Sequence, residues 1–443
     1  MKTINQSISV ARNISYKVLY DIYYNNAYSN LSIKKHFKAL KKEEDKALAT
    51  NIIFGTIKND IYLTDIIKKL SSVEYDKIKP EISVLLKAGI YQLYYMDRVP
   101  AYAVVNDCVN IAKFYVSNKS GAFVNAVLRN AGRQKSVINL DKDDISLMPL
   151  WLTDYMSEFY DKKFLNQWIE DFKKNPQMFV RVNQLKSTSQ EAFLSLNKDK
   201  LSCKKTFLPD VFKVLDSDAT LNSSLFLNSV ITVQDISAAL CAYALDTKKE
   251  EKVLDLCAAP GGKSLHIASL TEDQAFLTAC DIHQHKIDYM KNVFKYNDVK
   301  NIQVKKNNAE NHTKEFDNRF DKVIVDAPCS GLGVIKRKPE ILLRLTKRDI
   351  ENIIKIQSKI LNNAAKYVKN KGILLYCTCS INPKENELQI EKFLSQNHDF
   401  SLCDIKLPNT FYEHLNILQK GEIKLFSHAF DGDGFYICKM RKN

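Results

Sequence analysis

Two cysteines stand where strands of a predicted sheet end. Cys329 follows the apolar run 323–325, and Cys379 follows the apolar run 372–378. Asp326 lies three residues before Cys329. Because ligands of open α/β sheets bind beyond the carboxyl ends of the strands, we expect both thiols and the carboxyl group to face one pocket. A thiolate is a strong nucleophile, so this trio of side chains indicates covalent catalysis.

Three other roles for these cysteines are less favoured. A metal site would need histidines at matching spacing, and the ten cysteines form no Cys-x-x-Cys pattern, so we predict no metal. A disulfide is disfavoured in a reducing compartment. A single cysteine in a turn of small residues often only packs. Two cysteines at strand ends beside an aspartate make that last role less favoured here.

The element that must position a ligand beside these groups is the stretch 252–264. An apolar run at 253–256 predicts a buried strand, small residues follow, and a helical run begins at Lys263. The adjacent glycines Gly261 and Gly262 let the backbone approach a ligand closely, and the helix N-terminus offers free N–H donors. Strand, glycine turn and helix in this order predict a site for a nucleotide-like ligand.

The glycine turn narrows the choice of ligand. A phosphate-binding P-loop requires a glycine at the position that Cys257 occupies. A dinucleotide fingerprint requires G-x-G-x-x-G, whereas the glycines here are adjacent. A small ligand with an adenosine part remains, and S-adenosylmethionine (AdoMet) fits this description.

An acidic residue supports the adenosine interpretation. Asp281 ends the second predicted strand, 275–280, and lies 19 residues after Gly262. An acid at this distance from the glycine turn accepts hydrogen bonds from ribose hydroxyls. The alternative, that Asp281 only caps the following helix, stays open.

The length and composition of the chain limit the number of domains, the cellular location and the kind of partner that we expect. The 443-residue chain should fold into several domains, and it has no apolar run of about 18 residues, so we expect no membrane span. The N-terminus lacks the apolar core of a signal peptide, which favours a cytoplasmic protein. The net charge is +14, and residues 1–140 hold 21 Lys and Arg against 11 Asp and Glu. This excess suggests a polyanionic partner, although the chain is rich in lysine throughout.

Apolar spacing divides the chain into three parts. Over 1–140 the period is helical, as in the apolar face of 81–96, and predicts an all-α bundle of roughly five to seven helices. A polar linker is expected near 132–148. A small α+β lobe follows within 141–240, with a strand at 179–183, and 241–443 form a Rossmann-like α/β domain.

The bundle resembles a known RNA-binding domain. Residues 87–93, 99–106 and 123–130 are similar to the NusB domain, in the version fused to bacterial rRNA cytosine methyltransferases. The resemblance implies that this part binds RNA. The residues whose type suits phosphate contacts are Arg12, Arg129 and Arg133. Each of them could instead be an ordinary charge on a solvated helix face.

The small lobe resembles the RNA-recognition-like lobe of the same proteins. The runs 179–183 and 233–238 carry this similarity. Arg181 is therefore a further candidate RNA contact. The aromatic residues of a true RNA-recognition motif are absent, so the signal for independent RNA binding is weak.

The C-terminal part resembles RNA 5-methylcytosine methyltransferases. Residues 255–264, 326–331, 337–340, 378–380 and 431–436 are similar to the ordered motifs of that family. The resemblance implies AdoMet-dependent methylation of C5 of a cytidine in small-subunit (16S) rRNA by a monomeric enzyme. A tRNA or a large-subunit rRNA is the alternative substrate. A non-catalytic RNA-binding assembly factor is the alternative of another class.

The same resemblance implies a role for each site residue. Cys379 is the nucleophile that attacks cytosine C6, Asp326 contacts cytosine N3, and Cys329 aids release of the product; Cys377 lies outside the motif and is interpreted as structural. Where the family usually has an aspartate that holds the adenine amino group, this chain has Asn308. The implied cofactor site comprises Cys257, Ala258, Ala259, Pro260, Gly261, Gly262, Lys263, Asp281, Asn308 and Asp326.

Overall fold

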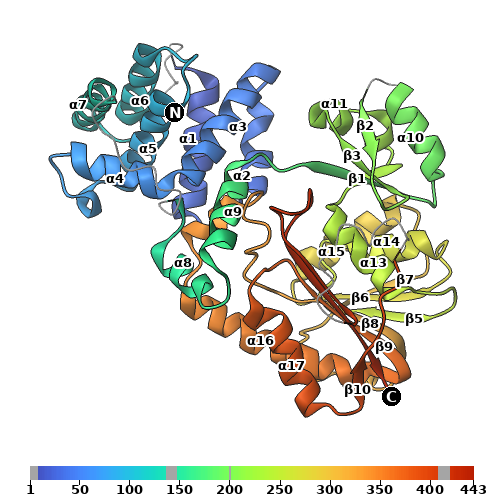
Figure 1. Cartoon of the computed structure of the whole chain (residues 1–443). Helices are drawn as coiled ribbons and strands as arrows, with labels where there is room; N and C mark the ends of the chain where they lie inside the picture. The colour runs from blue at the N-terminus through green and yellow to red at the C-terminus, as the bar shows by residue number, and fades with distance from the viewer. Residues whose placement is uncertain (1–7, 136–146, 199–200, 408–419) are drawn as a thin grey trace. The chain divides into compact units, whose positions relative to one another are not determined.

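The computed structural model describes residues 8–135, 147–198, 201–407 and 420–443 (Figure 1). The chain forms two compact units. One comprises Met1–Lys173 with Arg337–Leu345, and the other comprises Lys174–Lys336 with Thr346–Asn443. Most of the predicted linker near 132–148 lies outside the described residues.

The first unit is helical, as predicted. Helix α5 is buried along most of its length, and α1, α3, α4, α6 and α7 pack around it. Pro80 begins α5, where the missing N–H of proline costs no hydrogen bond. The helices of the bundle are α1 (Val10–Tyr24), α2 (Ser29–His36), α3 (Glu43–Lys58), α4 (Asp60–Leu70), α5 (Pro80–Tyr95), α6 (Ala101–Tyr115) and α7 (Asn118–Gln134).

Two further helices and a distant segment complete this unit. The helices are α8 (Leu150–Ser157) and α9 (Lys162–Lys173), and the segment is 337–345. The backbone N–H of Ser29 donates to Glu340 Oε1 at 2.9 Å, and Arg344 Nη2 donates to the carbonyl of Ala27 at 2.7 Å. The segment is therefore fixed to the loop between α1 and α2.

The second unit begins with the small lobe. Its four antiparallel strands have the order β2-β3-β1-β4, and Val180 pairs with Phe212 on one side and with Val233 on the other. The predicted strand at 179–183 is confirmed. The elements of the lobe are β1 (Met178–Val182), α10 (Ser189–Lys198), β2 (Cys203–Lys205), β3 (Val211–Val214), α11 (Ser217–Leu221), α12 (Ser224–Leu227) and β4 (Ile231–Val233).

An eight-stranded mixed sheet follows, in the order β10-β12-β9-β8-β5-β6-β7, with β11 paired to β12. The five strands from β5 to β9 are parallel, which confirms the predicted Rossmann-like part. The strands are β5 (Lys252–Asp255), β6 (Phe276–Asp281), β7 (Ile302–Lys306), β8 (Phe320–Asp326), β9 (Val368–Thr378), β10 (Phe400–Leu402), β11 (Glu422–Leu425) and β12 (Phe435–Lys442).

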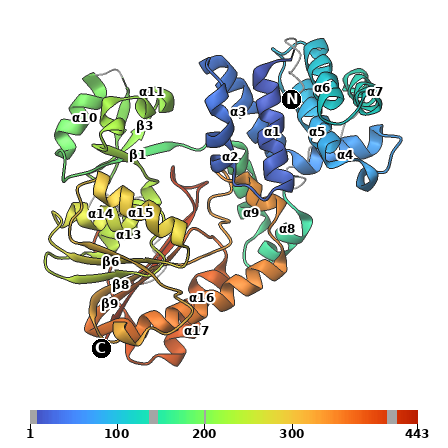
Figure 2. The same ribbon diagram turned by 180° about the vertical axis from the view of Figure 1, so that it is seen from behind.

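Helices cover both faces of this sheet (Figures 1 and 2). On one face lie α13 (Ile236–Leu245), α14 (Gly262–Leu270) and α15 (Gln284–Tyr296), and on the other lie α16 (Lys347–Tyr367) and α17 (Glu387–Gln396). The central strands β5, β8 and β9 are therefore largely buried on both sides, which explains their continuous apolar runs. Among the described residues, no helix has both the length and the apolar character needed to cross a membrane.

The order of the strands locates the ligand crevice. The chain runs outward from β5 through β6 to β7 on one side, and from β8 to β9 on the other. Ligands of such sheets bind beyond the carboxyl ends of the strands at this point of reversal. The crevice therefore opens at the ends of β5 and β8.

Candidate active site

Backbone pairing brings the ends of three strands together. Asp255 of β5 lies opposite Ile324 of β8, and Asp326 of β8 lies opposite Cys377 of β9. Beyond the last paired residues, the N–H of Ala327 still donates to the carbonyl of Cys377 at 2.8 Å. The loops that leave β5, β8 and β9 therefore emerge side by side.

The two predicted catalytic thiols meet at this edge. The Sγ atoms of Cys329 and Cys379 lie 3.2 Å apart, and neither cysteine forms a disulfide. The hydrogen bond with Cys379, together with burial, raises the pKa of the Cys329 thiol well above its ordinary value. Cys329 is therefore held as a neutral thiol, which can donate or share a proton.

The Asp326 carboxylate lies beside the thiols and is fixed by two neighbours. Lys263 Nζ donates to Oδ2 at 2.5 Å, and the Cys377 thiol approaches Oδ1 at 3.8 Å. Burial by itself lowers the pKa of Lys263, but the Asp326 carboxylate raises it well above its ordinary value. Lys263 thus remains charged, and Cys377, which sequence reasoning treated as structural, contacts the site.

The predicted glycine turn is present between β5 and α14. Gly261 has φ +104°, a backbone conformation that side chains rarely adopt, and it forms the N-cap of α14. A Cβ on Gly261 would lie 3.0 Å from the ring of Phe294. The predicted tight turn between the strand and the helix is therefore confirmed.

Sequence reasoning assigned no role to Asp255, the last residue of β5. Its Oδ2 accepts a hydrogen bond from Ser264 Oγ at 2.6 Å, whereas its buried Oδ1 has no partner among the described residues. Burial raises the pKa of Asp255 to about 7. The signal that could have revealed it is an acidic residue directly after a buried strand and before a glycine turn.

Asp281 and Asn308 lie at the ends of the next two strands. Asp281 is 7% exposed; its Oδ1 accepts from the N–H of His283 at 2.9 Å, and its Oδ2 lies 3.5 Å from Lys286 Nζ. Asn308 Oδ1 accepts from the N–H of Glu310 at 3.1 Å. Asp281 thus fixes the turn before α15, but it does not cap that helix, because the N-cap residue is His283 and no side chain caps it.

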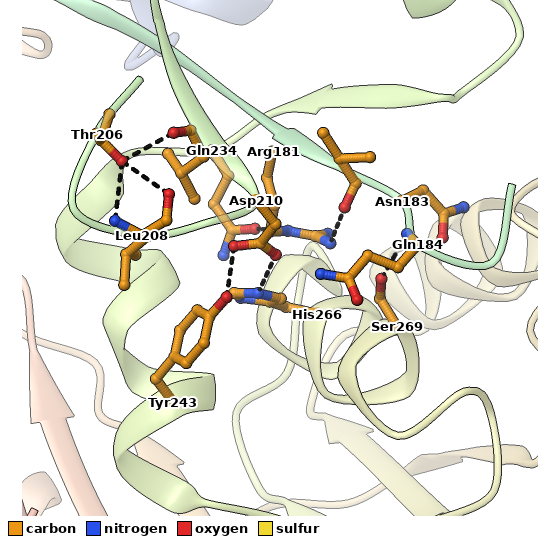
Figure 3. Close-up of polar contacts among 12 residues, drawn as sticks. Arg181, Asn183, Gln184, Thr206, Leu208, Asp210, Gln234, Tyr243, His266 and Ser269 are labelled. Atoms are coloured by element: carbon orange, nitrogen blue, oxygen red, sulfur yellow. Dashed lines mark hydrogen bonds and ion pairs between the residues drawn. The ribbon is translucent and has the colours of Figure 1, made fainter. Parts of the chain in front are cut away.

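The prediction that Arg181 contacts RNA is wrong. The side chain is 0% exposed, because β1 is an inner strand of the small sheet that packs onto α13 and α14. Arg181 Nε donates to Gln234 Oε1 at 2.6 Å and Nη1 donates to the carbonyl of Val182 at 3.3 Å (Figure 3). A guanidinium in this position cannot reach a phosphate.

Arg181 belongs to a buried polar network that sequence reasoning missed. Asp210 accepts from Tyr243 OH at 2.7 Å and lies 2.9 Å from His266 Nε2 (Figure 3). Burial, and then the charge of Arg181, lower the pKa of His266 to about 4, so this imidazole is neutral near pH 7. The network joins the small lobe to α13 and α14, and no local sequence pattern indicates it.

The three candidate arginines of the bundle differ from one another. The side chain of Arg12 is only 10% exposed, and it pairs with Asp107 Oδ2 at 2.7 Å and with Gln92 Oε1 at 2.8 Å. The prediction of a phosphate contact at Arg12 is therefore wrong, because its guanidinium is used inside the bundle. Arg129 and Arg133 are exposed and line one pocket of about 450 Å³.

In the parts of the chain that the structure describes, no group of three or more His, Cys, Asp and Glu side chains could hold a metal ion. The groups gathered at this edge of the sheet are a thiol pair, a carboxylate–lysine ion pair and a glycine turn beside two further carboxyl groups.

Comparisons with known proteins agree with this geometry. A model of the family "16S rRNA methyltransferase RsmB/F" matches residues 242–441, and a model of the NusB family matches residues 9–133. The chain is 32% identical over 442 residues to the probable ribosomal RNA small subunit methyltransferase B of Bacillus subtilis (strain 168). That alignment covers 97% of this chain and 98% of the relative.

Solved structures show the same fold. The crystal structure of PH0851 matches with a TM-score of 0.85 at 23% identity, and covers 98% of this chain and 99% of that protein. NSun6 from Pyrococcus horikoshii, solved with SFG, matches with a TM-score of 0.59 at 20% identity, over 66% of this chain and 98% of that protein.

Proposed function

The chain belongs to the RsmB/F family of 16S rRNA methyltransferases, and we propose that it transfers a methyl group from AdoMet to C5 of a cytidine in small-subunit rRNA. The observation that carries this proposal is the pair of thiols 3.2 Å apart at the ends of β8 and β9, beside the Asp326 carboxylate. Methylation at C5 needs a nucleophile for C6, and the site offers one.

The residues at the crevice fit an AdoMet ligand. Gly261 has the positive φ of a tight turn, the buried Oδ1 of Asp255 lacks a partner among the described residues, and Asp281 lies at the end of β6. Two carboxyl groups can accept hydrogen bonds from an amino group and from ribose hydroxyls. AdoMet, when bound, supplies an electrophilic methyl group. Asn308 would offer a neutral carbonyl oxygen to the adenine amino group.

Cys379 is proposed to act first. Its thiolate would form a bond to C6, and the electron pair of the C5–C6 double bond would bond C5 to the methyl carbon of AdoMet while the bond from that carbon to sulfur breaks and leaves its electron pair on the sulfur. Loss of the C5 proton to a base then returns an electron pair to the ring. That pair restores the double bond and expels the Cys379 thiolate.

Asp326 and Cys329 are proposed to assist these two stages. Lys263 holds the Asp326 carboxylate through a hydrogen bond of 2.5 Å and can pass a proton to it. Once protonated, the Asp326 carboxyl group can donate a hydrogen bond or that proton to cytosine N3, which makes C6 more electrophilic. Cys329, held as a neutral thiol, can hydrogen-bond the departing Cys379 sulfur and so aid release.

RNA contacts are proposed for the pocket on α6 and α7. Arg129 and Arg133 line it together with Tyr102, whose side chain is 79% exposed. Arginines suit phosphates, and an exposed aromatic ring suits base stacking. We place the enzyme in the cytoplasm, where its rRNA substrate is made.

Bisulfite sequencing of rRNA and tRNA from a strain lacking this protein tests the function. The proposal expects one small-subunit rRNA cytidine to lose its protection from conversion. Loss of protection only in tRNA or in large-subunit rRNA would favour the alternative substrates. Unchanged protection in all of these RNAs would contradict the activity and favour a non-catalytic assembly factor.

A further inference from the structure

A buried carboxylate connects the loops that carry the two thiols. Glu385 is 0% exposed and lies in the short helical turn Pro383–Glu385, six residues after Cys379. Its Oε1 accepts from Ser380 Oγ at 2.8 Å and from Ser330 Oγ at 2.5 Å, and its Oε2 accepts from the backbone N–H of Ser330 at 2.8 Å. Ser330 and Ser380 directly follow the thiols Cys329 and Cys379.

Further hydrogen bonds fix Glu385 itself, from β9, from the Cys379 loop and from α16. Tyr376 OH of β9 donates to the carbonyl of Glu385 at 2.8 Å, and Asn382 Nδ2 donates to Oε1 at 3.1 Å. Gln357 Nε2 of α16 donates to Oε2 at 3.1 Å and to the carbonyl of Pro328 at 3.0 Å, just before Cys329. Glu385 therefore acts as a rigid anchor rather than as a passive member of either loop.

The neighbouring residue Asn386, in contrast to Glu385, forms side-chain hydrogen bonds only around the Cys379 loop. Its Oδ1 accepts from Thr378 Oγ1 at 2.6 Å, and its Nδ2 donates to the carbonyl of Ser380 at 2.9 Å. These bonds fix the chain on either side of Cys379 and leave the Cys329 loop untouched. The Glu385 carboxylate bonds to both loops, and hydrogen bonds to a carboxylate are stronger than those between neutral groups.

We propose that Glu385 is a positioning residue that fixes the separation of the Cys329 and Cys379 thiols. The assignment of steps to these thiols rests on the proposed function, but the positioning itself does not. A carboxylate that bonds to both loops keeps the nucleophile and its partner thiol together through attack and release. Without it, the loops separate and both thiol-dependent steps slow.

Phenylarsine oxide measures the thiol pair independently of methylation. This trivalent arsenical forms two As–S bonds and releases water without any change of oxidation state, and it binds tightly only where two thiols lie close together. Glu385→Gln, which keeps the size of the side chain but not its charge, should lower the affinity for the arsenical at least tenfold. Cys329→Ala, which lacks the pair, gives the baseline.

The matched control is Glu387→Gln. Glu387 lies two residues further on, and its Oε1 accepts from Lys424 Nζ at 2.6 Å rather than from a thiol loop. This variant should keep the wild-type affinity for the arsenical. Methyl transfer by Glu385→Gln should show a kcat at least tenfold lower at an unchanged KM for AdoMet.

Wild-type arsenical affinity in folded Glu385→Gln would overturn the proposal. If that variant does not fold, Ser380→Ala removes one of the hydrogen bonds to Glu385; it should weaken arsenical binding by a smaller factor, and unchanged binding would contradict the proposal. A loss of arsenical affinity in an enzyme that methylates no cytidine would leave the positioning role intact and remove only the proposed function.

Discussion

Lys263 and Asp326 form an ion pair of 2.5 Å across the crevice. Lys263 is the second residue of α14, directly after the glycine turn, whereas Asp326 is the last residue of β8. The pair therefore joins the loop proposed to hold the methyl donor to the loop that carries Cys329, one of the two thiols proposed to be catalytic. A change at either residue should affect cofactor binding and catalysis together.

Lys263→Met tests this connection. Removal of the ammonium group leaves the Asp326 carboxylate without its partner, so kcat/KM for methyl transfer should fall roughly 10²-fold, the lower end of the usual range for general acid–base groups. Initial rates with labelled AdoMet and rRNA measure it. Lys249→Met, which removes an exposed lysine paired with Glu272, is the matched control and should retain full activity. Equal activity of the two variants would contradict a role for the ion pair.

The two thiols should give opposite phenotypes. Cys379→Ala removes the proposed nucleophile and should abolish methyl transfer without forming any protein–RNA adduct. Cys329→Ala should slow release, so that a covalent adduct accumulates and is visible by denaturing gel electrophoresis. Cys403→Ala replaces a partly exposed cysteine outside the site and should behave as wild type. Turnover by Cys379→Ala would refute the nucleophile assignment, and normal release by Cys329→Ala would refute the second role.

Asp281→Ala should weaken AdoMet binding much more than RNA binding. The loss of a carboxylate proposed to accept hydrogen bonds from ribose should cost roughly 1–3 kcal/mol, or about 5- to 150-fold in Kd. Calorimetry with AdoMet and filter binding with rRNA separate the two effects. Asp288→Ala removes a nearby acid of α15 and serves as the control. An unchanged AdoMet affinity would leave Asp281 with only its role in the turn before α15.

Arg129 and Arg133 should act differently from Arg12. If each of the exposed arginines contacts one phosphate, its replacement by alanine lowers the salt dependence of RNA binding by roughly one unit of slope on logarithmic axes. Arg12→Ala should instead lower the melting temperature of the bundle, because it leaves buried Asp107 without its cation. RNA binding measured from about 50 to 200 mM salt distinguishes these outcomes. An unchanged slope in the double variant Arg129→Ala/Arg133→Ala would remove this surface from the RNA site.

Two buried groups should give opposite pH dependences of stability. The pKa of His266 is lowered from 6.5 to about 4, so the unfolded chain takes up a proton first, and stability is lost as the pH falls from 6.5 towards 4. The pKa of Asp255 is raised from 3.8 to about 7, so stability is lost as the pH rises from about 4 to 7. At 1.4 kcal/mol per pKa unit, the effects are roughly 3 and 4 kcal/mol.

Hydrogen exchange of β5 and α14, corrected for intrinsic rates between pH 4.5 and 7, measures both effects. His266→Gln should flatten the loss of protection at low pH, and Asp255→Asn should flatten the loss towards pH 7. The two tryptophans, Trp151 and Trp168, lie in the first unit, so their fluorescence does not report on this one. Identical pH profiles of wild type and variants would contradict both shifts.

The central parallel strands could be predicted from the sequence, because a strand that is buried on both faces consists of a short continuous run of apolar residues. The apolar run 323–325 lies within β8, and the glycine turn at 261–262 begins α14. These two elements were enough to predict the edge of the sheet at which Cys329 and Cys379 lie. The thiol pair was predictable because parallel strands place their carboxyl ends at one edge.

Features that depend on contacts distant in sequence could not be predicted. Arg181 alternates along its strand like a solvent-facing residue, and only the packing of the small sheet onto α13 and α14 buries it. Glu385 reaches Ser330 across 55 positions, and Asp210 reaches His266 across 56. Burial of a charged group is decided by partners that no local pattern reveals.

The segment 337–345 has a consequence for the order in which the chain is made. It belongs to the first unit, yet about 160 residues of the second unit separate it from Lys173. The chain is synthesised from the N-terminus. The carbonyl of Ala27 can therefore accept its hydrogen bond only after Arg344 has been made, and the N–H of Ser29 can donate only after Glu340 has been made. The helical unit is thus the first to emerge from the ribosome, but it cannot be completed until four of the eight strands of the sheet have been translated.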